Sequence, residues 1–313
     1  MSAYSKINTR APGSIMLMGE HAVLFGEPAL ACALEHWLEV ELTPLASQRV
    51  EIDSALARYR SDLSQLQPEP ALSFVLAVIE AYRPYLKQGF RLQIRSGFSH
   101  TVGLGSSAAV TAAVTAALAE FCGTDTTPEA LFEVALHAVH QAQNGRGSGT
   151  DLAASIYGGV VQYRVSPRTV ERLNGLPPLA LLYCGYKMKT PEVLALVESR
   201  AASQPSLYAG LYRLMGQTCE AGRSAVDSAD WSQLGQLMNL YQGLMDALGV
   251  NDATLSEMIW RLRAQPGILG SKISGSGLGD CVLALGHMTE TLPWESIPVS
   301  VAATGVEISH DTC

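Results

Sequence analysis

The most informative stretch of this chain is Gly103-Leu104-Gly105-Ser106-Ser107-Ala108-Ala109. It lies between two runs of different character. Apolar and polar residues alternate at 90–95, as is typical of a strand, and residues 108–121 are rich in Ala and Val, as is typical of a buried helix. Two glycines let the backbone approach a ligand closely, and the unpaired N–H groups at a helix start attract anions. The stretch therefore predicts a phosphate-binding loop. A glycine-rich turn capped by Ser106 is the alternative, so the other motifs have to decide.

Composition restricts the class of protein. The chain has 313 residues, of which 48% are hydrophobic and 16% charged, enough for one large domain or two smaller ones. Its net charge of −8 argues against nucleic acid or an anionic membrane as the main partner. The longest apolar run is too short to span a membrane, and the polar N-terminus lacks the apolar core of a signal peptide. Six cysteines without metal-type spacing indicate reduced thiols, so we expect a cytoplasmic protein.

Two further glycine-bearing stretches carry polar residues. Gly19-Glu20-His21 follows an apolar run at 15–18 that predicts a buried strand. A Glu and a His in such a place are costly to bury unless they are paired, and an open surface turn is the alternative. A late loop at residues 270–281 leads into a predicted strand at 282–285. Neither this loop nor residues 103–109 has the GxxxxGK[ST] pattern of a Walker A motif.

Asp151 is the most informative carboxylate. It stands between a glycine-rich loop at 144–150 and an apolar run at 152–156. A carboxylate held there could act on a substrate hydroxyl, or cap the segment that follows, and the two roles are compatible. His137 and His140 are three residues apart on a predicted helix, as metal ligands can be. No third ligand has a matching spacing, which argues against a metal site there.

The polar segment at 164–178, with three prolines, is the best candidate for a domain boundary. It divides the chain into residues 1–170 and 171–313. Beyond it we expect a buried strand at 179–183, a turn that carries Lys187, Lys189 and Thr190, and helices at about 191–202, 206–229 and 231–248.

Together, three motifs resemble the signature motifs of the GHMP small-molecule kinases. They are Pro-Gly-x3-Leu-x-Gly-Glu-His-Ala-Val from Pro12, GLGSSAA from Gly103 and KxSGSGxGDC from Lys272, and the match spans residues 11–285. The first motif looks most like that of the mevalonate kinases. The resemblance implies a two-domain α+β fold, with an N-terminal domain like domain 2 of ribosomal protein S5 and a ferredoxin-like C-terminal domain. It also implies transfer of the ATP γ-phosphoryl group to a hydroxyl, with Mg2+, in the cleft between them, and a possible homodimer.

The resemblance also implies roles for individual residues. Asp151 would be the catalytic carboxylate, and Ser107 and Glu20 would hold Mg2+. The ATP phosphates would lie on one set of residues and the substrate against another. The first set is Gly103, Leu104, Gly105, Ser106, Ser107 and Ala108, with Gly275, Ser276 and Gly277 beside them; the second is Glu20, His21, Arg146, Lys187, Lys189 and Thr190.

Two positions depart from the mevalonate kinase pattern. Ser14 stands where those enzymes usually carry a lysine that is thought to help the hydroxyl lose its proton. Arg146, Lys187 and Lys189 are the candidates to supply that charge. His140 stands where they place an acidic Mg2+ ligand, and a neutral imidazole is a poor ligand for this hard cation. We therefore expect Mg2+ to rest on Ser107, Glu20, ATP oxygens and water.

Other features lean toward phosphomevalonate kinase. They are the segment Ala142-Gln143-x-Gly-x-Gly-Ser-Gly-x-Asp and Asp280 in the last motif. The substrate of that enzyme carries an additional phosphate and demands more cationic residues. The expected function is ATP-dependent phosphorylation of mevalonate, with phosphomevalonate kinase as the runner-up. A ligand-sensing protein of the same fold without catalysis is the alternative from another class, and the departures at Ser14 and His140 keep it open.

Overall fold

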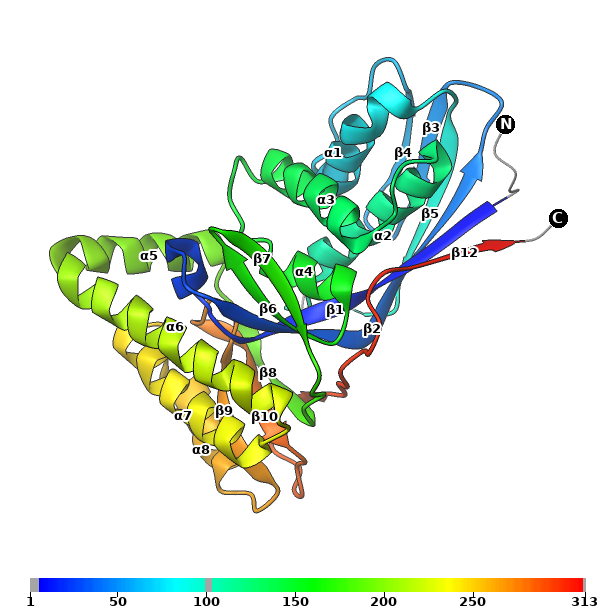
Figure 1. The fold of residues 1–313 in the computed structure, drawn as a ribbon. Helices are drawn as coiled ribbons and strands as arrows, with labels where there is room; N and C mark the ends of the chain where they lie inside the picture. Colours follow the sequence, from blue (N-terminus) through cyan, green and yellow to red (C-terminus); the bar gives the residue numbers. More distant parts are fainter. Residues whose placement is uncertain (1–5, 99–102, 312–313) are drawn as a thin grey trace.

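The computed structural model describes residues 6–98 and 103–311, which form two sheets with separate sets of helices (Figure 1). The first sheet has eight strands, in the order β12-β1-β2-β5-β3-β4, with β6 on β2 and β7 on β6. All its pairs are antiparallel except β3 with β5. The strands are β1 (Lys6–Met18), β2 (Ala29–Pro44), β3 (Arg49–Asp53), β4 (Arg58–Asp62), β5 (Phe90–Ser96), β6 (Val160–Val165), β7 (Arg168–Leu173) and β12 (Glu307–Asp311).

Four helices gather on one side of this sheet (Figure 1). They are α1 (Ser73–Tyr82), α2 (Ser106–Cys122), α3 (Pro128–Ala142) and α4 (Thr150–Tyr157). The alanines of α2 allow it to lie close to β1, where the Thr9 hydroxyl donates a hydrogen bond to the Ala113 carbonyl at 2.8 Å. Three 3-10 turns, η1 (Ala22–Phe25), η2 (Pro70–Leu72) and η3 (Arg83–Tyr85), complete this half.

The second sheet is antiparallel, in the order β11-β8-β10-β9. Its strands are β8 (Leu179–Lys187), β9 (Ile268–Ser274), β10 (Gly279–Gly286) and β11 (Glu295–Ile297), and its helices are α5 (Thr190–Ser203), α6 (Pro205–Asp227), α7 (Trp231–Leu248) and α8 (Ala253–Arg263). All of β10 is buried, as expected for a central strand under helices. None of the helices in the described ranges has the length and apolar character needed to cross a bilayer.

The predicted domain boundary needs two corrections. The polar segment at 164–178 is not a linker throughout, because β7 lies in it and forms a hairpin with β6. The C-terminal residues do not all belong to the second half, because β12 returns to the first sheet and pairs with β1. This strand covers the edge of β1, which would otherwise expose a row of unpaired N–H and C=O groups.

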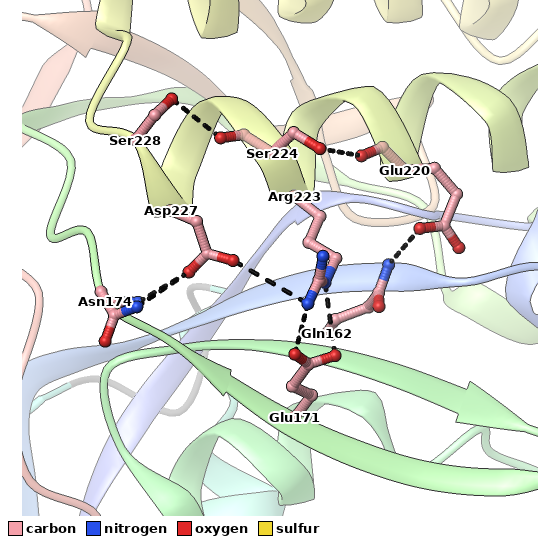
Figure 2. A network of polar contacts seen from close by, with 8 residues as sticks. All are labelled: Gln162, Glu171, Asn174, Glu220, Arg223, Ser224, Asp227 and Ser228. Carbon is pink, nitrogen blue, oxygen red and sulfur yellow. Dashed lines mark hydrogen bonds and ion pairs between the residues drawn. The ribbon is translucent and has the colours of Figure 1, made fainter.

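A polar network joins the two halves along α6 (Figure 2). Gln162 of β6 donates a hydrogen bond to Glu220 at 3.1 Å, and Arg223 forms an ion pair with Glu171 of β7. Asp227 accepts a hydrogen bond from the backbone N–H of Asn174 at 3.1 Å. Helix α6 of the second half is therefore fixed against the β6–β7 hairpin of the first.

Candidate active site

The phosphate loop, defined here as residues 103–108, begins α2 and packs closely on β1. The Ser14 N–H donates a hydrogen bond to the Leu104 carbonyl at 3.0 Å. Gly105 has the left-handed φ of 68°, and a Cβ there would lie 2.0 Å from Ser14 Oγ. No side chain of the described residues caps α2 at this glycine, so the first N–H groups of the helix remain available to a ligand. The loop thus has the geometry of an anion cradle.

Asp151 lies in the first turn of α4, beside this loop. Ser14 Oγ donates a hydrogen bond to Asp151 Oδ1 at 3.0 Å. Burial raises the pKa of Asp151, and the charge of Glu20 raises it further. The Ser14 hydrogen bond and the charge of Lys187 lower the same pKa and offset part of that rise. A carboxylate with a raised pKa is a better proton acceptor than an ordinary one.

Glu20 is 2% exposed and forms a buried ion pair with Lys272 of β9. The Lys272 ammonium lies 2.5 Å from Glu20 Oε1, and the Gly275 N–H donates to the same oxygen at 3.4 Å. The Tyr241 hydroxyl donates to the Glu20 carbonyl at 3.1 Å. Glu20 Oε2 has no hydrogen-bond partner among the described residues. Burial raises the pKa of Glu20, and Lys272 offsets part of this rise.

His21 joins the same motif to the late glycine loop. Its Nε2 lies 2.9 Å from the Ser276 carbonyl, so this nitrogen carries the proton and donates it. The residue is 5% exposed, and burial lowers its pKa, which favours the neutral ring. Its φ of 61° is rare for a residue other than glycine. Glu20 and His21 are therefore buried and paired, and the alternative of an open surface turn is wrong.

Asp280 connects the late loop to the phosphate loop. Its Oδ1 accepts a hydrogen bond from the Gly103 N–H at 3.1 Å, and its Oδ2 lies 2.6 Å from the Lys187 ammonium. A Cβ on Gly103 would lie 2.1 Å from Oδ2, so only glycine leaves room for the carboxylate. The sequence motifs did not predict this contact.

The structure brings most of the predicted site residues together. Glu20 and His21 contact the late glycine loop at Gly275 and Ser276. Ser14 joins Asp151 to the phosphate loop, since it contacts both. Lys187 joins them through Asp280. Three predicted residues, Arg146, Lys189 and Thr190, are exposed, and among the described residues none forms an ion pair or side-chain hydrogen bond with this group.

Sequence reasoning missed the roles of Tyr241, Lys272 and Asp280. Lys272 had a usable signal, because a lone lysine inside a buried strand requires a counter-ion and Glu20 was a buried carboxylate that also required one. Tyr241 had none, since it is one aromatic residue on the buried face of a helix.

The described residues do not form a cluster of three or more His, Cys, Asp or Glu side chains that could hold a metal ion. His140 Nε2 lies 3.1 Å from the Gly147 carbonyl.

Known proteins match this chain along most of its length. Its sequence matches the family models for the GHMP kinases N terminal domain at residues 73–159 and GHMP kinases C terminal at 223–290. Mevalonate kinase of Pyrococcus furiosus is 30% identical over 304 residues, which cover 90% of this chain and 89% of that protein. Mevalonate kinase of Methanothermobacter thermautotrophicus is 32% identical over 288 residues, covering 89% and 90%.

The fold agrees with these sequence matches. The crystal structure of L. major mevalonate kinase in complex with R-mevalonate superposes with a TM-score of 0.79 and 22% identity, covering 97% of this chain and 99% of that one. The two-domain α+β architecture predicted from the motifs is confirmed. The chain belongs to the GHMP kinases.

Proposed function

We propose that this protein is a kinase that transfers the γ-phosphoryl group of ATP to a hydroxyl of mevalonate. The observation that carries the proposal is the contact of Ser14 with Asp151 beside the start of α2, which puts a proton acceptor next to an anion cradle. The mevalonate kinases that match the chain over about nine tenths of its length support the choice of substrate.

The phosphate loop fits the phosphates of ATP. Gly105 turns the backbone into an uncapped helix start, and Ser106 and Ser107 add two hydroxyls in the first turn. Backbone N–H groups and the helix dipole at such a start favour anions. The loop of Gly275, Ser276 and Gly277 would lie beside the phosphates, since the Asp280 contact holds the two loops together.

Mg2+, when bound, neutralises and orients the phosphate oxygens. Ser107 fits a role in holding it, because this residue is exposed in the first turn of α2. Glu20 fits less well than its sequence position implied, because it is buried and one of its oxygens is bound to Lys272. Ser107, oxygens of ATP and water are therefore the ligands that we propose.

Phosphoryl transfer needs little covalent chemistry from the protein, so positioning and charge stabilisation supply most of the rate. Asp151 would accept the proton of the attacking hydroxyl, and Ser14 would hold its carboxylate in place. The N–H groups at the start of α2 would stabilise negative charge on the phosphate oxygens during transfer.

The test is a coupled ADP-release assay with ATP and Mg2+, in which mevalonate and phosphomevalonate are offered in parallel. Turnover with mevalonate alone is the expected result. Turnover with phosphomevalonate alone would replace the proposal by the runner-up. Binding of ATP and of either acid without any ADP release would instead identify a ligand-sensing protein.

A further inference from the structure

Negative charge accumulates around the phosphate loop. Asp280 accepts a hydrogen bond from the Gly103 N–H of the loop. Asp151 accepts one from Ser14, whose own N–H is bound to the Leu104 carbonyl of the loop. Glu20 adds a third carboxylate, whose charge is matched by the buried Lys272. A triphosphate that enters this region would be repelled unless a further cation is present.

Lys187 is the cation that the fold places there. It ends β8, and its ammonium lies 2.6 Å from Asp280 Oδ2, while Oδ1 of the same carboxylate accepts the Gly103 N–H. One carboxylate therefore bridges the lysine to the first amide of the phosphate loop. The Lys187 side chain is 37% exposed, so its charge is accessible to a ligand.

The backbone around Asp280 is arranged to hold this carboxylate. Asp280 has a φ of 69°, and the pairing of β10 with β8 shifts register between Gly279 and Cys281. Gly279 has a φ of 123°, and a Cβ there would lie 2.8 Å from the Tyr186 carbonyl. A non-glycine residue kept in a rare conformation, with its side chain only 13% exposed, indicates a function for that side chain.

We propose that Lys187, oriented by Asp280, contacts the terminal phosphate of ATP and stabilises the charge on the phosphoryl group during its transfer. Asp280 is then a positioning residue. This inference rests on the proposed kinase function. It selects one of the three cations named in the sequence analysis, because Lys187 is paired with a carboxylate that contacts the phosphate loop. Within the described part of the chain, Arg146 and Lys189 form no ion pair or side-chain hydrogen bond.

The first test compares Lys187→Met with Lys6→Met. Lys6 is a matched control, because it is 41% exposed and pairs with one carboxylate, Glu41, at 3.0 Å in the other half of the protein. We expect Lys187→Met to lower kcat about 100-fold, as removal of one charge-stabilising donor does. If Lys187 contacts the terminal phosphate, the wild type should bind a non-hydrolysable ATP analogue more tightly than ADP in calorimetry. Lys187→Met should abolish this difference in affinity. Lys6→Met should leave both measurements unchanged, and Lys187→Arg should restore part of each.

The second test asks whether Asp280 acts by orienting Lys187. Asp280→Asn keeps an acceptor for the Gly103 N–H but loses the charge that holds Lys187, so kcat should fall about 10-fold. The double variant with Lys187→Met should be no slower than Lys187→Met alone, because interacting residues are not additive. Losses that simply multiply, or an ATP-over-ADP preference that survives Lys187→Met, would overturn the inference. A wild-type protein that binds ATP without turnover would refute the kinase function, while the binding preference still decides the role of Lys187.

Discussion

At the scale of single residues, Asp151 is the group on which the proposed chemistry depends. Asp151→Asn removes the proton acceptor but keeps the shape of the side chain and an oxygen for the Ser14 hydroxyl. We expect kcat to fall by about 10³-fold, within the range for general-base catalysis. Nucleotide affinity, measured by calorimetry, should stay near the wild-type value, since the phosphate loop is untouched. A loss of nucleotide binding would show that Asp151 has another role.

Ser14 influences the protonation of this carboxylate, although burial has the larger effect on its pKa. Its hydrogen bond lowers the pKa of Asp151, which burial raises, so Ser14→Ala should raise that pKa further. A base must be deprotonated to work, and kcat/KM therefore falls as the pH drops through its pKa. The acid limb of the pH profile should lie at higher pH in Ser14→Ala than in the wild type. Ser155→Ala is the control, because Ser155 Oγ is buried in α4 without a hydrogen-bond partner among the described residues.

At the scale of elements, α2 provides a matched pair of glycines. Gly105 and Gly123 flank its two ends with φ values of 68° and 66°. A Cβ on Gly105 would meet Ser14 Oγ at 2.0 Å, whereas one on Gly123 would meet nothing within 4 Å. Gly123→Ala should lower the free energy of unfolding by about 1 kcal/mol through backbone strain alone. Gly105→Ala should cost more and also weaken nucleotide binding, and equal effects of the two changes would contradict the crowding at Ser14.

The elements also show where sequence reasoning succeeds. The sequence predicts a helix at 108–121, and α2 spans Ser106–Cys122. The agreement is close because the signals of this helix are local, namely a run of alanines between glycines. The sequence predicts a strand only at 15–18, whereas β1 begins at Lys6. A register shift at Pro12 and Gly13 lets the pairing continue past residues that usually end a strand. Strand β12 was not expected, because its only partner lies at the other end of the chain.

The site, like the fold, combines features with local sequence signals and contacts between residues far apart in the chain. The phosphate loop and Asp151 have glycines as immediate neighbours, and these glycines are the local signal from which the sequence predicts a site there. The pairs that complete the site join residues far apart: Glu20 and Lys272 are 252 residues apart, and Gly103 and Asp280 are 177 apart. A local pattern can show that a buried charge such as Lys272 requires a partner, but it does not identify that partner, which depends on how the two sheets pack.

At the scale of the whole molecule, the Glu20–Lys272 pair joins the two halves in the buried centre of the protein. The side chains are 2% and 0% exposed, and Lys272 also lies 5.3 Å from the centre of the Tyr241 ring. Lys272→Met would leave a buried carboxylate without its counter-ion. We expect the free energy of unfolding, measured with denaturant, to fall by about 3–5 kcal/mol. The exposed pair of Glu257 and Arg261 is the control, and Arg261→Met should cost less than about 1 kcal/mol.

The pH dependence identifies the charge of Glu20 as the cause. Burial raises the pKa of Glu20 in the folded state above its unfolded value, and Lys272 opposes that rise. In Lys272→Met the penalty is therefore present above the folded pKa and is relieved as the pH falls through it. The free energy of unfolding of Lys272→Met should therefore approach that of the wild type as the pH falls. His21 titrates in both proteins, so its contribution cancels in this comparison. Adding Glu20→Gln should recover much of the loss at neutral pH and remove its pH dependence. A deficit that stays constant with pH would assign the loss to the packing of Lys272 rather than to its charge.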